Sequence, residues 1–184
     1  MSEIVYPVER LSVYVSEQVL DLVKELGDGL EQVAAANAAL PGIEDLLVTV
    51  DTDPVPLFGL SLYAQLRALT NAQFPEGAVG LIHTRSAQLL EVALGRPGFS
   101  DELQRWTGAL SDGWKQLTGK DAASAGDWIQ HIVAVFEAHY GPDMQNQGAI
   151  WAQLFYLTLI ADTYRQNATL MAEQLRQSMQ AAAV

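Results

Sequence analysis

Cysteine is absent from the 184 residues, which excludes disulfide bonds, thiolate metal sites and cysteine nucleophiles. Long hydrophobic runs are lacking too, because the longest, residues 149–161, falls short of the roughly 20 apolar residues that cross a bilayer. The first residues carry no basic segment ahead of an apolar run, so no secretion signal is expected. These absences favour a cytoplasmic protein without a membrane span.

Basic residues are scarce: the chain has 10 Lys and Arg against 22 Asp and Glu, for a net charge of −12. Eleven of the acids and two of the bases lie in residues 1–53, which gives this segment a charge of −9. An acidic surface repels phosphates and anionic lipids and attracts basic partners. We therefore expect no nucleic-acid partner. Simple solubility, or adaptation to a salty cell, is the other explanation of the charge.

Apolar residues recur every three or four positions over most of the chain, which is typical of helices that bury one face. The pattern predicts helices over residues 7–40, 60–74, 79–94, 100–117, 124–140 and 149–184. Residues 43–50 could form a short helix followed by an extended piece, because residues 46–50 have the composition of a strand, but no second clear strand is available to pair with them. We therefore predict an all-α fold, a single-domain bundle of about six helices over residues 1–184 with a long C-terminal helix.

Glycine, proline and capping residues predict where these helices bend or end. Gly27 and Gly29 indicate a bend in the first helix or a close approach by another helix. Residues 51–56, with two aspartates and two prolines, are expected to form a loop. Residues 95–98 predict a sharp break between two helices, and Ser100 is the expected N-cap of the second.

The C-terminal helix suggests an interaction surface. Its first half is apolar on almost every side and is predicted to form the core. At about 1.5 Å per residue the helix is about 55 Å long, whereas a compact chain of this length is only about 40 Å across. The overhanging end carries a narrow apolar stripe, so we predict that Met171, Leu175 and Met179 mediate binding to a partner or to a second copy. An elongated bundle that covers the stripe internally is the alternative.

The acidic N-terminal segment suggests a second part of this interaction surface. Four carboxylates, together with the acidic first helix, are expected to face a basic protein partner. They are Glu44, Asp45, Asp51 and Asp53.

Tryptophans on successive predicted helices provide the alternative to an interaction protein. Trp106, Trp128 and Trp151, with His131, are candidates to line an apolar pocket for a flat ligand such as a pigment, haem or lipid. The simpler interpretation of such residues is packing in the core. No phosphate loop, nucleophile elbow or di-iron pattern is present, so we expect no cofactor and no resident metal. The leading hypothesis is a non-enzymatic, self-associating interaction protein, and the alternative is a helical ligand-binding protein or enzyme.

Overall fold

The computed structural model describes residues 8–36, 53–72, 74–118, 134 and 138. These contain four helices, α1 (Val8–Ala36), α3 (Val55–Asn71), α4 (Glu76–Leu94) and α5 (Phe99–Thr118), and the described part has no strand. The all-α prediction is therefore confirmed. The predicted segments 43–50, 124–140 and 149–184 lie mainly or wholly outside the described residues, so the six-helix bundle and the long C-terminal helix stay predictions. Within the described part, none of the helices has the length and apolar character that a membrane span requires.

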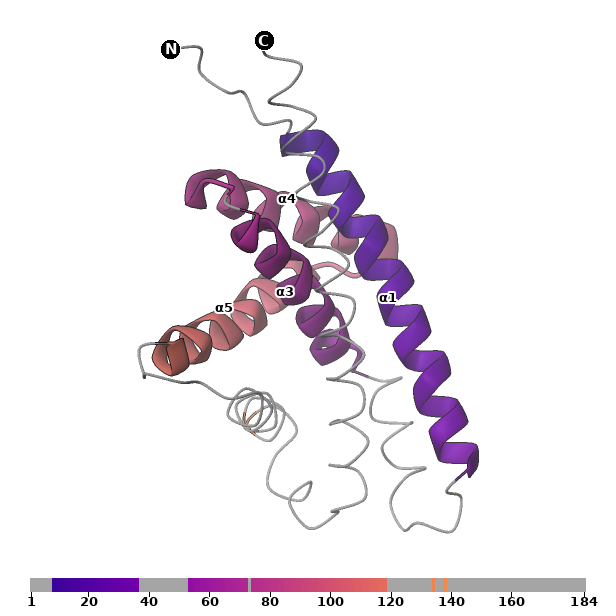
Figure 1. Cartoon of the computed structure of the whole chain (residues 1–184). Coiled ribbons are helices and arrows are strands. Elements are labelled where there is room, and N and C mark those ends of the chain that lie inside the picture. The colour runs from indigo at the N-terminus through magenta and orange to yellow at the C-terminus, as the bar shows by residue number, and fades with distance from the viewer. Residues whose placement is uncertain (1–7, 37–52, 73, 119–133, 135–137, 139–184) are drawn as a thin grey trace, which may run out of the picture.

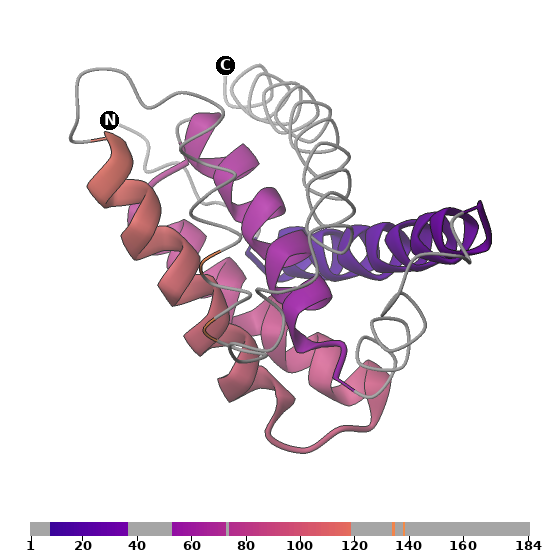
Figure 2. The same cartoon turned by 90° about the horizontal axis from the view of Figure 1, so that it is seen from below.

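Helix α3 lies at the centre of this arrangement, between α1 and α5 (Figure 1, Figure 2). Between Val55 and Thr70, every residue except Arg67 and Thr70 is buried. Both α1 and α5 pack on α3 and on α4 as well. A helix buried on all sides has apolar residues all round, which is the character that the sequence suggested for residues 149–161. Among the described residues, α3 has this role.

Helix α1 buries one stripe of apolar side chains and leaves its acidic side in solvent. The buried residues Leu11, Val15, Val19 and Leu22 are spaced as one face of a helix requires. Among the described residues, nothing lies within 4 Å of a Cβ built at Gly27 or Gly29, so the predicted bend or close approach at these glycines stays a prediction. α1 continues through both glycines, at a cost of about 1 kcal/mol for each.

The close contact of α1 with α4 occurs at two serines. Ser12 and Ser86 are completely buried, and the Ser86 hydroxyl donates to the Ser12 carbonyl oxygen at 3.2 Å. Small side chains at a helix crossing allow a short distance between the axes. Beside this crossing, Arg85 Nε donates to Glu9 Oε2 at 3.2 Å, in an exposed ion pair. Exposed pairs of this kind add little stability, so the apolar stripe holds α1 in place.

Helix α3 begins earlier than predicted, because Pro56 belongs to its first turn and not to a loop. Proline suits this position, where the backbone N–H has no partner within the helix. Asp53 Oδ1 accepts a hydrogen bond from the Val55 N–H at 3.3 Å. Gly59 lies inside the helix, where a Cβ would be only 2.6 Å from Cε3 of Trp106. This glycine therefore serves the contact between α3 and α5.

The break between α4 and α5 is confirmed at residues 95–98. Gly95 and Gly98 have φ values of 59° and 84°, a region of the backbone that favours glycine. The predicted capping role of Ser100 is wrong, because α5 already begins at Phe99. The Ser100 N–H instead donates to Glu91 Oε2 at 2.9 Å, so a carboxylate from α4 satisfies an amide in the first turn of α5.

Candidate functional site

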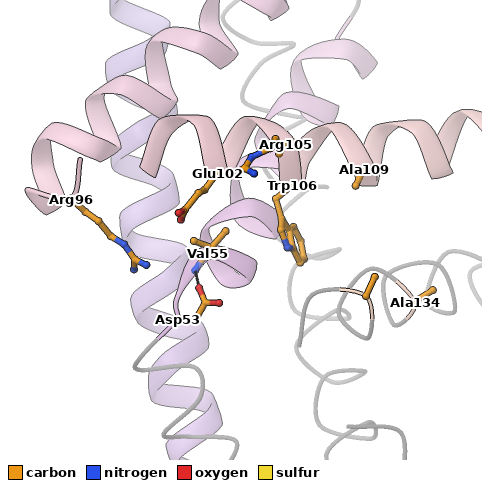
Figure 3. Close-up of a pocket in the computed structure, with 9 residues that line it drawn as sticks. Asp53, Val55, Arg96, Glu102, Arg105, Trp106, Ala109 and Ala134 are labelled. Carbon is orange, nitrogen blue, oxygen red and sulfur yellow. Dashed lines mark hydrogen bonds between the residues drawn. The ribbon is translucent and has the colours of Figure 1, made fainter. Parts of the chain in front are cut away.

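A cavity of about 560 Å³ opens beside Trp106 (Figure 3). Helix α5 supplies one wall, the start of α3 supplies a second, and the connection between α4 and α5 contributes an arginine. The described lining residues are Asp53, Val55, Arg96, Glu102, Arg105, Trp106, Ala109, Ala134 and Ala138.

The inner wall of this cavity is apolar. Val55 and Trp106 are 3% and 6% exposed, so both belong to the core as well as to the cavity. The Trp106 ring lies against Gly59 of α3 on one side. On the other side it projects from α5 toward Ala134 (Figure 3). Small alanine side chains complete the wall and leave room for a bound molecule.

The charged residues among the described lining of the cavity are balanced. Two carboxylates, Asp53 and Glu102, are matched by two guanidinium groups, Arg96 and Arg105. Figure 3 shows Arg96, Glu102 and Asp53 around Val55, away from the Trp106 ring. The Arg96 guanidinium also lies over the Phe99 ring, with Cζ 5.2 Å from the ring centroid, in a cation–π contact. The described lining thus combines an apolar end with an end of mixed charge.

The structure brings together two residues that the sequence assigned to different surfaces. Asp53, predicted to face a protein partner, and Trp106, predicted to line a ligand pocket, border the same cavity. The other candidates, Glu44, Asp45, Asp51, Trp128, His131, Trp151, Met171, Leu175 and Met179, lie outside the described residues. Self-association through the C-terminal helix and the acidic loop of residues 44–51 therefore stay predictions.

Seven of the described lining residues were missed by the sequence analysis: Val55, Arg96, Glu102, Arg105, Ala109, Ala134 and Ala138. Glu102 lies four residues before Trp106 and Ala109 three residues after it, on the same face of α5, so helical periodicity around Trp106 was the available signal for these two. No sequence pattern indicated Arg96, because its place depends on how the connection after Gly95 folds back toward α3.

The acidic surface of α1 is accessible over the whole helix. Its six carboxylates, all exposed, are Glu9, Glu17, Asp21, Glu25, Asp28 and Glu31. The charge predicted to attract a basic partner therefore faces solvent. The described residues contain no group of three or more histidines and carboxylates arranged to hold a metal ion.

A polar pair, formed by a half-buried histidine and a buried threonine, lies between α4 and α5. His83 Nε2 is 2.8 Å from Thr107 Oγ1, and the Thr107 hydroxyl donates to the Leu103 carbonyl oxygen at 2.9 Å. Which of the two groups donates in the contact between His83 Nε2 and Thr107 Oγ1 depends on the tautomer of the imidazole. Burial lowers the pKa of His83, because the protein interior disfavours the charged imidazolium.

This lowered pKa predicts a stability that depends on pH. Between about pH 6.5 and the lower pKa of the folded state, the unfolded chain binds a proton at His83 that the folded protein does not bind. Stability should therefore fall as the pH drops through this window and should change no further, on account of His83, below the folded pKa. Urea unfolding of the protein and of His83→Gln at a series of pH values measures the difference. If the free energy of unfolding changed with pH equally in both proteins, burial of His83 would not be a cause of the pH dependence.

Comparisons of the chain with protein-family models, curated proteins and solved structures gave no match. The functional argument therefore depends on the cavity beside Trp106 and on the residues that line it.

Proposed function

We propose that this protein is a binding protein for a small, flat, apolar molecule that occupies the cavity beside Trp106. The observation that carries the proposal is the cavity itself, since about 560 Å³ lies within the roughly 300–1,000 Å³ typical of small-molecule sites. Its apolar wall and its few charged groups match the usual composition of such sites.

The Trp106 ring is the main apolar surface offered to the ligand. A planar molecule in contact with this ring loses apolar surface to water on both partners, which favours association. Because Gly59 brings α3 against the ring, the indole is held before the ligand arrives. A ring that is already ordered loses little conformational entropy on binding.

The charged end of the cavity then selects the orientation of the ligand. At this end Asp53 and Glu102 accept hydrogen bonds, whereas Arg96 donates them. With two charges of each sign, the described lining favours a neutral ligand that has polar substituents at one edge. A strongly charged ligand would lie close to two groups of its own sign in the cavity, and their repulsion would weaken its binding.

Filling the cavity should abolish binding without unfolding the protein. Ala109 is exposed and lines the cavity, so Ala109→Leu places a larger side chain where the ligand would lie. With prodan, a neutral naphthalene dye whose fluorescence rises in apolar surroundings, we expect Ala109→Leu to weaken binding by at least about tenfold.

The matched control for this experiment is Ala93→Leu. Ala93 is an exposed alanine on α4 that is not among the lining residues, so the substitution adds the same side chain at a surface outside the cavity. This variant should bind the dye like the unmodified protein. Equal dye affinity in Ala109→Leu and Ala93→Leu would contradict the proposed site.

A further inference from the structure

A second cavity, of about 510 Å³, lies between α3, α4 and α5. Helix α5 borders both cavities, but with different faces: Trp106 and Ala109 line the first, and Thr107 and Ser111 line the second. The described residues around the second cavity are Tyr63, Leu66, Arg67, Thr70, Phe74, Glu76, Val79, Gly80, His83, Thr107, Gly108, Ser111 and Asp112.

Two glycines in helix interiors keep this space open. Gly80 of α4 and Gly108 of α5 both line the cavity, and a Cβ at either position would meet nothing within 4 Å. Glycine inside a helix costs about 1 kcal/mol relative to alanine. Neither position needs glycine for packing against the described residues, in contrast to Gly59. Their absent side chains leave the volume between two packed helices unfilled.

Polar groups border the same space. A hydrogen bond between His83 Nε2 and Thr107 holds the imidazole in one orientation, and Thr107 is only 2% exposed. The Ser111 hydroxyl and the Asp112 carboxylate, on the next turn of α5, add hydrogen-bond acceptors.

The charges around the cavity favour a cation. Among the described lining residues, the carboxylates of Glu76 and Asp112 are opposed by the guanidinium of Arg67, and burial lowers the pKa of His83, which disfavours its charged form. The described lining therefore has one excess negative charge. The whole chain, at a net charge of −12, also draws cations toward its surface.

The remaining lining is apolar and aromatic. Tyr63, Leu66 and Phe74 are buried and belong to the core cluster, and Val79 packs against it. They provide a surface for a hydrocarbon or aromatic group, and aromatic faces also attract cations. A ligand that suits both parts has an apolar body and one positively charged donor.

We propose that this second cavity binds a small primary amine with an apolar or aromatic body. The ammonium group donates to the hydroxyl of Ser111 and to the carboxylate of Asp112. The body packs on Tyr63, Leu66 and Phe74, in the space that Gly80 and Gly108 leave open. This site is independent of the one beside Trp106.

Three probes that share a phenyl body but differ in charge test the site: phenethylamine, phenethyl alcohol and hydrocinnamate. Each is titrated into the protein, and amide NMR shifts in α4 and α5 are followed. The amine should bind most tightly and the carboxylate most weakly, by at least about tenfold. Hydrocinnamate binding as tightly as phenethylamine, or no saturable shift with the amine, would overturn the proposal.

Cavity-filling variants locate the binding. Gly108→Leu and Gly80→Leu each fill the cavity from a different helix, and each should weaken amine binding by at least about tenfold. Ala93→Leu, on the exposed side of α4, should bind the amine normally. Undiminished amine binding by the folded leucine variants would place the amine elsewhere and overturn the assignment.

Discussion

Replacing Phe99 by alanine should lower the free energy of unfolding by about 3–5 kcal/mol, the range for a buried phenylalanine. Phe99 is completely buried and is the first residue of α5. Its ring meets the Phe58 ring of α3 edge to face, with centroids 5.4 Å apart. The alanine variant loses this aromatic contact and leaves a cavity at the point where α5 joins α3. Chemical denaturation measures the change.

Two further variants make the Phe99 prediction specific. Phe99→Leu keeps most of the apolar volume and should cost clearly less than the alanine variant. Leu81→Ala removes a side chain that is 62% exposed and should change stability by no more than about 0.5 kcal/mol. If Phe99→Ala also fell within that small range, the packing of α5 on α3 described above would be incorrect.

Replacing Gly59 by alanine should destabilise the protein by about 1–3 kcal/mol, as overpacking of a core does. The new methyl group would lie 2.6 Å from Cε3 of Trp106, so the ring or a helix must move. This cost exceeds the gain of about 1 kcal/mol that alanine brings to a helix. Gly108→Ala provides the matched control, because its methyl group meets nothing within 4 Å and should stabilise the protein by about 1 kcal/mol.

A double-mutant cycle tests the cause of the Gly59 effect. The nearest atoms to the added methyl group all belong to the Trp106 side chain. In a Trp106→Leu background, Gly59→Ala should therefore cost much less than in the unmodified protein. Additive costs in the two backgrounds would show that Trp106 is not the obstacle. Because Trp106 also lines the first cavity, Gly59→Ala should weaken dye binding as well.

The helices were predictable where one face of the chain is buried. The stripe of Val15, Val19 and Leu22 appears in the sequence because its spacing reports burial on one side of a helix. α3 was harder to delimit, since it is buried on nearly every side and begins with Val55 and Pro56. A segment that is apolar on nearly every side shows little helical periodicity, and prolines at its start resemble those of a loop.

Glycine shows why the site was only partly predictable. Gly95 was correctly interpreted as a helix end, because a left-handed backbone is a local property that nearby residues indicate. The purpose of Gly59 depends on Trp106, and that of Gly80 and Gly108 depends on an unfilled space between helices. Such relations arise only in the folded chain. For the same reason, Trp106 was a candidate from its residue type, whereas Arg96 and His83 emerged from their neighbours.

Fluorine NMR of the protein labelled with fluorinated tryptophan tests the central proposal, that a flat apolar ligand lies on Trp106. The chain has four tryptophans, and the spectrum of Trp106→Phe assigns the resonance of interest. During titration with prodan, the Trp106 resonance should shift saturably and with the dissociation constant obtained from dye fluorescence. A Trp106 resonance that stays in place at saturating dye would contradict the proposal.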